Sequence, residues 1–338
     1  MLPRMGATML DIAKDLNVSV VTVSKVLSNK GNISSATRAK VLQKAKELNY
    51  QKNWIASSLV TRRTFTIGLL LPDFTHPFFG EIAKAVAEAV RPKGFHVIIS
   101  YFEEDPALER TEAESLLARQ VDGLILASAQ PPQDSDLFQS IQKRKVPFVL
   151  IDRPMEHVRS SFVGGDDVAI GRLATEHLVR QGCRRIAHLR GPGAGIAARR
   201  QEGYRSVLEK NKLPSHQIIE AGYDDYTGHE AMKQLLYASP LPDGVFCYND
   251  PVAIGAMQAI LEAGLQIPKD IAVVGAGNVH YSNVLAVPLT TVDQGTQQIG
   301  TRAAELLLEQ IDSKRAVRPK KVLITPKLVV RQSTQRAV

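Results

Sequence analysis

A short run near the start of the chain constrains the fold more than any other. Residues 9–27, MLDIAKDLNVSVVTVSKVL, place apolar side chains three or four residues apart on both sides of a break at Asn17 and Val18. This spacing predicts two short helices joined by a tight turn. Thr8 and Ser19 stand where N-caps belong, because a hydroxyl oxygen accepts hydrogen bonds from the first turn of a helix. A second helix with a polar, basic outer face is the device that enters a DNA major groove.

A third helix is expected over residues 35–49, after a capping Ser34. Three helices within about 45 residues form a small but complete core. We expect the inner face of the second helix to be Val23, Val26 and Leu27, and its outer face to be Val20, Val21, Ser24 and Lys25. The apolar stripe of the third helix is predicted to be Val41, Leu42, Ala45 and Leu48.

The charge of the chain is concentrated in this same region. Residues 1–64 contain 11 Lys and Arg against 3 Asp and Glu, whereas the rest of the chain contains 31 of each kind. The excess of +8 therefore belongs to the first 64 residues. Such an asymmetry is typical of nucleic-acid binding, and the helical pattern favours a folded module over a solvated basic tail.

Length and composition set further limits. A chain of 338 residues suits two or three domains. Cys183 and Cys247 lie in or beside apolar runs and are expected to be buried thiols in a reducing compartment. No apolar run reaches the roughly 18 residues of a membrane span, and the first residues lack a signal-peptide core. We expect a cytoplasmic, nucleoid-associated protein with no cofactor and no metal site.

The N-terminal motifs resemble the lactose-repressor family of bacterial transcription regulators. They are SVVTVSKVL at 19–27, ISxxTRxKV at 33–41 and LNYxxNxxAxxL at 48–59. The resemblance runs along the whole chain and implies that positions 20, 21 and 25 read bases while several hydroxyls hold phosphates. Valine offers no hydrogen bond but packs on a thymine methyl, so Lys25 supplies the polar contact. The DNA-binding residues that it implies are Thr8, Ser19, Val20, Val21, Thr22, Ser24, Lys25, Asn32, Thr37, Tyr50, Asn53, Ala56 and Leu59.

The same resemblance implies a hinge helix within residues 53–64. Nine or so residues are too few for a helix that is stable alone in water, so the segment is expected to fold on DNA. Leu59 is the expected wedge, which unstacks a central base step in the minor groove. The alternative is a linker with stray apolar residues.

From Phe65 onward, apolar runs alternate with helical segments, which predicts parallel, doubly wound sheets. Expected strands are 66–71, 96–101, 123–127, 148–151, 161–163, 186–189, 244–248, 271–274, 290–292 and 323–330. The fold class is α/β, and the resemblance implies a three-helix headpiece, a hinge helix and a periplasmic-binding-protein-like body of two Rossmann-like lobes. The expected divisions are 1–52 for the headpiece, 53–64 for the hinge, 65–161 with 293–321 for one lobe, and 162–292 with 322–338 for the other.

The loops that follow these strands supply candidates for a ligand cleft between the lobes. Aromatic plates together with a guanidinium or carboxylate suit a hydroxyl-rich ring. The candidates are Phe78, Phe79, Asp166, Arg200, Tyr223, Asn249, Asn278 and Gln294. Each has a structural alternative, since Asp166 and Asn249 also suit helix N-caps and the phenylalanines suit the core.

One departure from the family bears on the ligand. Family members carry Gly-Phe-Asp-Asp after the strand before the last crossover, whereas this chain has Gly275-Ala276-Gly277-Asn278. Gly277 replaces the carboxylate that holds ligand hydroxyls. The change makes room for a larger or more anionic ligand, with Asn278 as a partial substitute.

Two other classes of protein would each explain part of the sequence. A nucleotide-dependent enzyme would explain the glycines of residues 191–195, but the pattern is not GxGxxG, it lies in the middle of the chain, and we expect no acidic residue at the right strand end after it. No nucleophile with a base and an orienting group is evident either. A solute receptor explains the body but not the headpiece. The sequence therefore predicts a homodimeric repressor, not an enzyme, which binds a palindromic operator and is controlled by a sugar-like ligand.

Overall fold

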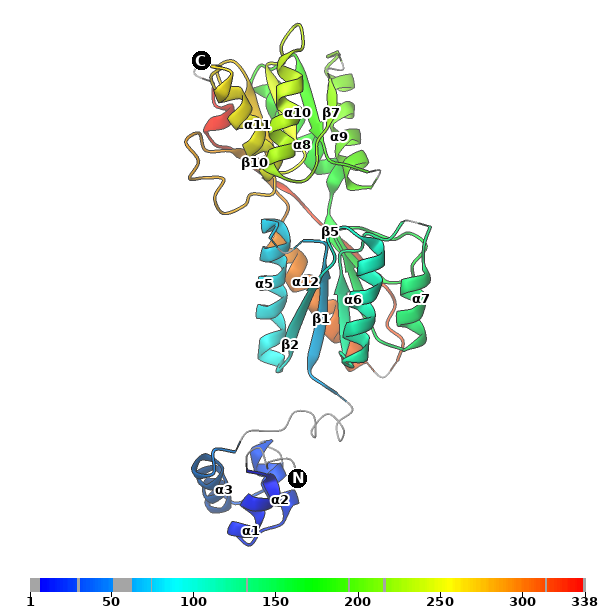
Figure 1. Cartoon of the computed structure of the whole chain (residues 1–338), viewed down its shortest axis with the longest axis vertical. Coiled ribbons are helices and arrows are strands. Elements are labelled where there is room, and N and C mark those ends of the chain that lie inside the picture. Colours follow the sequence, from blue (N-terminus) through cyan, green and yellow to red (C-terminus); the bar gives the residue numbers. More distant parts are fainter. Residues whose placement is uncertain are drawn as a thin grey trace. The chain divides into compact units, whose positions relative to one another are not determined.

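The computed structural model describes residues 7–28, 31–50, 63–73, 75–131, 133–193, 195–214, 217–313 and 315–336. The chain divides into two compact units, residues 1–64 and 65–338, which are described separately below (Figure 1). Asn53, Ala56 and Leu59 of the predicted hinge lie outside the described residues.

The smaller unit contains three helices, α1 (Met9–Asp15), α2 (Val20–Leu27) and α3 (Ser35–Glu47). Thr8 begins α1 with a capping box, in which its hydroxyl accepts from the Asp11 amide at 3.3 Å and its own amide donates to the Asp11 carboxylate at 2.8 Å. Ser19 and Ser34 cap α2 and α3 in the predicted way. Asn17 takes the positive φ of 50° that the tight turn between α1 and α2 requires.

The core of the smaller unit differs from expectation at one position. Ile12, Val23 and Val41 are fully buried and pack together, as predicted from their spacing. Leu42, which we placed in the apolar stripe of α3, is 49 % exposed. Val41 and Ala45 are four residues apart and share the inner face, whereas one step along the helix turns Leu42 about 100° away from it.

The larger unit consists of two lobes, each built on a six-stranded sheet (Figure 1). The N-lobe sheet has the order β11-β5-β4-β3-β1-β2, and all its strands are parallel. Its strands are β1 (Thr66–Leu71), β2 (His96–Tyr101), β3 (Gly123–Leu126), β4 (Phe148–Ile151), β5 (Ser161–Gly165) and β11 (Lys321–Ile324). Its helices are α5 (Pro77–Val90), α6 (Pro106–Ala118), α7 (Asp136–Lys143), α12 (Thr296–Asp312) and the 3-10 turn η1 (Arg91–Lys93). Helices α5 and α12 cover one face of the sheet and α6 and α7 cover the other.

The C-lobe sheet has the corresponding order β12-β10-β9-β8-β6-β7, in which β12 is antiparallel and the other strands are parallel. Its strands are β6 (Ile186–Arg190), β7 (Ile218–Glu220), β8 (Gly244–Cys247), β9 (Ala272–Ala276), β10 (Thr290–Asp293) and β12 (Lys327–Val329). Its helices are α8 (Asp167–Arg180), α9 (Ile196–Lys210), α10 (Asp225–Leu236), α11 (Asp250–Glu262) and the 3-10 turn η2 (Gln332–Thr334). The two lobes therefore share one strand order, and residues that follow the carboxyl ends of strands in both sheets line a common cleft.

The last strands correct one prediction. Residues 323–330 do not form one strand, because β11 belongs to the N-lobe sheet and β12 runs antiparallel to β10 in the C-lobe sheet. Pro326 lies between them, and it has no backbone N–H with which to continue a ladder. The chain also crosses between the lobes after β5 and after β10. The first of these crossovers follows Gly165, a few residues later than expected.

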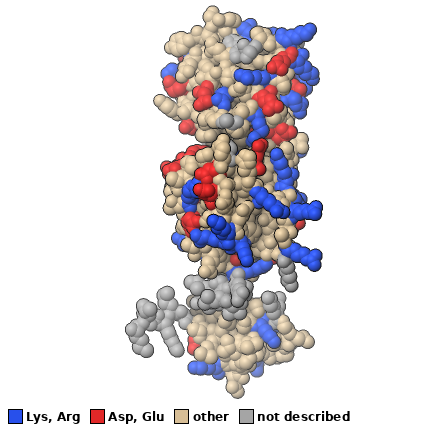
Figure 2. Space-filling view, turned by 90° about the vertical axis from the view of Figure 1, so that its right-hand side faces the viewer, with Lys and Arg blue, Asp and Glu red and all other residues tan. Residues whose placement is uncertain are grey.

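The surface of the larger unit agrees with its neutral composition. On the face shown in Figure 2, Lys and Arg side chains alternate with Asp and Glu over both lobes. Within the described part of the chain, none of the helices has both the length and the apolar character needed to cross a membrane.

Candidate DNA-binding surface and ligand cleft

Helix α2 presents the predicted outer face. Val21 is 62 % exposed and Val20 is 37 % exposed, while Val23 on the same helix is fully buried. Ser24 and Lys25 are also exposed. Two exposed valines beside a lysine and a serine have no packing role within this unit, so they are available to contact a partner.

The predicted phosphate-holding hydroxyls gather at the helix N-termini. The Ser19 and Thr22 hydroxyls lie 2.9 Å apart at the start of α2, and the Ser34 hydroxyl donates to Thr37 Oγ1 at 2.8 Å at the start of α3. Helix N-termini favour anions because their first N–H groups and the helix dipole are both positive. Among the other predicted residues, Thr8 and Asn32 are exposed, whereas Tyr50 is half-buried against the core.

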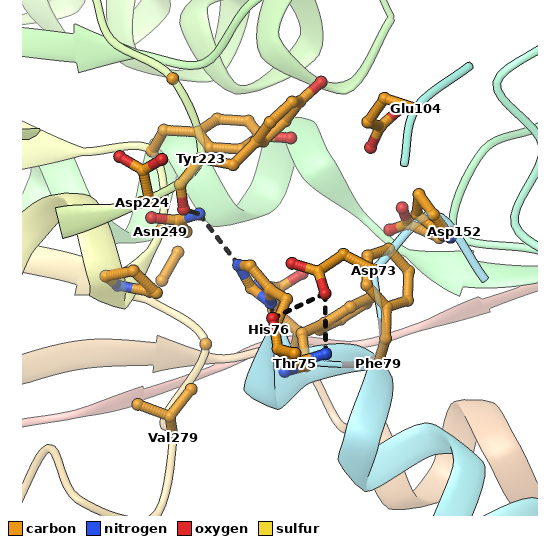
Figure 3. A pocket seen from close by; sticks show the side chains of 18 of the residues that line it. Asp73, Thr75, His76, Phe79, Glu104, Asp152, Tyr223, Asp224, Asn249 and Val279 are labelled. Carbon is orange, nitrogen blue, oxygen red and sulfur yellow. Dashed lines mark hydrogen bonds between the residues drawn. The ribbon is translucent and has the colours of Figure 1, made fainter. Parts of the chain in front are cut away.

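A cavity of about 610 Å³ lies between the two lobes of the larger unit. Its lining comes from the loops at the carboxyl ends of strands in both sheets, as expected for paired Rossmann-like lobes. The N-lobe contributes residues after β1, β2 and β4. The C-lobe contributes Arg200 on α9, which follows β6, and residues after β7, β8, β9 and β10. Figure 3 shows side chains from these loops pointing into the same space.

Six of the eight predicted ligand residues line this cavity. They are Phe78, Phe79, Arg200, Tyr223, Asn249 and Gln294. Some of these residues line the cavity and also have the structural role considered as its alternative. Asn249 caps α11, and the two phenylalanines pack in the N-lobe core. Asp166 does not line the cavity; it caps α8, accepting from the Ala169 amide at 3.0 Å.

Asn278 is turned away from the cavity. Its amide donates to Asp293 at 3.2 Å, and its carbonyl oxygen accepts from Arg331 at 2.7 Å. It therefore does not replace the missing family carboxylate. Gly277 does line the cavity, with a φ of 153°, and a Cβ built there would lie 3.3 Å from the Asp250 carboxylate. The local backbone thus favours glycine at this position.

Arg200 is held by three partners at the back of the cavity. Its Nε donates to Asp167 at 3.1 Å, and its two terminal nitrogens donate to the Tyr248 carbonyl at 2.5 Å and to Gln294 Oε1 at 2.8 Å. It also lies over the Tyr248 ring at 4.7 Å. Arg200 is almost fully buried, and its N–H groups are used in hydrogen bonds within the protein.

Sequence reasoning missed a charged cluster on the N-lobe side. Arg153 donates to both oxygens of Glu104 at 2.6 and 2.5 Å. Burial alone would lower the pKa of Arg153, but the ion pair with Glu104 outweighs it, so the pKa is raised. Asp152, at a positive φ of 63°, has Arg153 Nε 3.6 Å away. Burial raises the pKa of Asp152 to about 6. The available signal was a pair of charged residues directly after the buried strand β4.

Aromatic side chains form the C-lobe wall. Tyr223 and Tyr248 lie with ring centroids 6.0 Å apart, over a small apolar cluster with Ile196 and Ala197. Gly191 has to be small here, because a Cβ at this residue would come within 2.6 Å of the Tyr248 ring. The glycines considered above as a phosphate loop therefore include one needed for packing.

Comparison with known proteins identifies both parts of the chain. The family "Bacterial regulatory proteins, lacI family" matches residues 8–53, and the "Periplasmic binding protein-like domain" matches residues 175–334. The ribose operon repressor of Halalkalibacterium halodurans is 37 % identical, over 97 % of both chains. The repressor PurR of Haemophilus influenzae is 33 % identical over 97 % of this chain and 99 % of its own.

The chain belongs to the lacI family. Its fold agrees with that assignment, since the lac repressor dimer, solved with its operator and the anti-inducer ONPF, superposes with a TM-score of 0.87. That match has 28 % identity and covers 98 % of this chain and 100 % of the other. As a lacI-family member the protein is a DNA-binding transcription repressor. Its relatives named here are repressors, not enzymes.

Within the lacI family, the two surfaces described above fall in the two matched regions. The exposed face of α2 lies inside the DNA-binding region at residues 8–53. The C-lobe wall, with Arg200, Tyr223 and Asn249, lies inside the binding-protein-like region at residues 175–334. Recognition of DNA and recognition of a small molecule are thus assigned to separate units of the chain.

Proposed function

We propose that this repressor binds a palindromic operator as a homodimer and acts on chromosomal DNA in the cytoplasm. The observation that carries the proposal is the outer face of α2, where Val20, Val21, Ser24 and Lys25 lie exposed beside buried Val23. One such helix covers a half-site, so a twofold dimer matches a palindrome. The solved lac repressor dimer on its operator supports this arrangement.

The edge of the N-lobe sheet supports a self-association surface. Strand β2 pairs with β1 on one side, and Ile98, Ile99 and Tyr101 on it are 36, 47 and 45 % exposed. An edge strand with exposed apolar side chains is costly in a monomer because it invites pairing and burial. We propose that this edge lies in the interface between two copies of the chain.

For the cleft, we propose a neutral, hydroxyl-rich ligand of the saccharide class. Tyr223, Phe78 and Phe79 supply flat apolar surfaces for a ring, while Asp152 and Asn249 supply polar atoms around it. Among the described residues, five carboxylates line the cavity against two guanidiniums. Both guanidiniums are already paired, Arg153 with Glu104 and Arg200 with Asp167. An anionic ligand, which the loss of the carboxylate at Gly277 suggested, would face uncompensated negative charge.

The DNA proposal is tested by selection. The purified full-length protein is incubated at about 0.15 M salt with a random double-stranded DNA pool, because affinity depends steeply on salt. We expect enrichment of a palindrome with thymines at the steps that face Val20 and Val21. Enrichment of a single, asymmetric half-site would contradict the dimeric reading.

The ligand proposal is tested with matched pairs of compounds. Thermal unfolding of the protein is followed with D-ribose against D-ribose 5-phosphate, and with other pentoses and hexoses against their phosphates. A ligand that binds the folded state raises the midpoint as its concentration rises. We expect at least one neutral sugar to raise the midpoint and its phosphate to have a smaller effect. A phosphate that stabilises more than its parent sugar would overturn the proposal.

A further inference from the structure

One hydrogen bond in the cleft joins the two lobes directly. His76 caps α5 in the N-lobe, and its Nε2 lies 3.2 Å from the Nδ2 of Asn249, which caps α11 in the C-lobe (Figure 3). Both side chains line the cavity. Sequence analysis selected Asn249 but not His76.

The orientation of the Asn249 amide is fixed by its other contacts. Its Oδ1 accepts from the Val252 amide at 2.8 Å, and its Nδ2 donates to the Tyr223 carbonyl at 2.8 Å. Turning the amide over would set oxygen against oxygen at Tyr223 and donor against donor at Val252. The remaining N–H of Asn249 therefore points at His76, which has to accept it.

The second ring nitrogen of His76 faces another donor. The Phe78 amide lies 3.3 Å from Nδ1, as the cap of α5. A neutral imidazole has one acceptor nitrogen and one N–H. His76 can accept from Asn249 or from Phe78, but not from both at once, and a protonated ring accepts from neither.

We propose that His76 is a positioning residue that joins the lobes when neutral and releases them when protonated. The neutral ring accepts from either Asn249 or the Phe78 amide of the α5 cap, and the protonated ring accepts from neither. The contact deepens the function proposed for the cleft, because a ligand that accepts the same Asn249 N–H competes with His76. Occupancy of the cleft would then free His76 to cap α5.

The surroundings of His76 favour the neutral ring. Burial is the largest effect and lowers its pKa, and the guanidiniums of Arg200 and Arg153 act in the same direction. The carboxylates of Asp73 and Glu104 oppose this. Because the folded-state pKa is lowered, the contribution of the contact to stability is fully present above the ordinary histidine pKa of about 6.5 and is lost as the pH falls through the lower, folded-state pKa.

A double-mutant cycle on the ligand-free, full-length protein tests the contact. His76→Phe keeps a ring of similar size, and Asn249→Ser keeps a hydroxyl that can cap α11 but is too short to reach His76. Midpoints of thermal unfolding of the larger unit are measured for both single variants and the double variant, at about pH 8 and pH 5.5. We expect the two shifts to be non-additive at pH 8, with a smaller coupling at pH 5.5, because lowering the pH increases the fraction of protonated His76 rings.

Two further variants separate the contact from its alternatives. His76→Asn restores an α5 cap but is too short to reach Asn249, so it should remain uncoupled from Asn249→Ser. His280→Phe, at an exposed histidine outside the cavity, should combine additively with Asn249→Ser at both pH values. Additive shifts of His76→Phe and Asn249→Ser at pH 8, or equal coupling at both pH values, would overturn the proposal. No sugar is present in these measurements, so their outcome does not depend on the ligand class.

Discussion

At the scale of single residues, the cleft uses the same side chains to hold the fold together and to present polar atoms. Arg200 shows this most clearly, because its donors are spent on Asp167, Tyr248 and Gln294. From sequence alone, Arg200 is a ligand contact whose loss should abolish the response to the ligand without affecting DNA binding itself. The structure adds that the residue ties α8, α9 and the crossover after β10 to one point.

We therefore predict two effects of Arg200→Ala. The response of DNA binding to the ligand should be lost, and the free energy of unfolding of the larger unit should fall by about 3 kcal/mol, since Asp167 and Gln294 are left without a buried partner. Arg199 still pairs with Asp167 at 3.2 Å and limits the loss. Denaturant titration measures the stability. Arg180→Ala, at a largely exposed pair with Glu176, is the control and should cost under about 1 kcal/mol.

The exposed and buried valines of α2 give a second test at this scale. Val21→Ser should leave the smaller unit folded, because Val21 is 62 % exposed, and should weaken discrimination at one base step by about 1–3 kcal/mol. Affinity for the selected operator and for single-base variants of it measures this. Val23→Ala, two residues along and fully buried, should instead destabilise the unit by about 2 kcal/mol. Uniform weakening across all sequences by Val21→Ser would argue against base contact.

At the scale of elements, the hydrophobic periodicity of the sequence predicted strands and helices well where neighbouring residues alone determine the structure. Strands β1 and β2 begin and end at the predicted residues, and the three N-caps of the smaller unit are where their hydroxyl side chains indicated. Strand β7, with three residues, is too short to leave a pattern. The 323–330 prediction failed because an apolar run does not reveal which sheet each half joins.

The site followed the same division. Loops after strands were found from sequence, but which of their side chains converge depends on the order of the strands within each lobe and on the packing of one lobe against the other. His76 and the pair of Arg153 with Glu104 were therefore missed, and Asn278 was placed on the wrong side of its own backbone. Caps such as Asp166 carry the same residue types as ligand contacts, so sequence cannot separate the two.

The edge strands of the N-lobe sheet give a prediction about assembly. Ile99→Lys on β2 should convert the dimer to a monomer at micromolar concentration and weaken operator binding with it, because a charge would be buried without a partner. Sedimentation velocity measures the mass. Leu323→Lys is the matched control, since β11 is the opposite edge of the same sheet and Leu323 is 51 % exposed. A dimer that survives Ile99→Lys would place the interface elsewhere.

At the scale of the whole molecule, the chain separates its charge from its ligand chemistry. The 64 N-terminal residues hold the whole excess of +8, and residues 65–338 are neutral. Long-range attraction to DNA is therefore a property of the smaller unit, while the cleft recognises its ligand without a net field that would attract anions.

This separation predicts the behaviour of a chain that begins at Phe65. Residues 65–338 form a compact unit with two complete lobes, so the fragment should fold, remain dimeric through the β2 edge and bind the same sugar with unchanged affinity. It should lose operator binding entirely, and the steep fall of the full-length affinity with salt should have no counterpart in the fragment. Sedimentation, calorimetric titration with the sugar and a salt series on operator DNA check these three properties. A monomeric fragment would place the dimer interface in residues 1–64. The Ile99→Lys variant of the full chain would then remain a dimer, so the two experiments test the same interface independently.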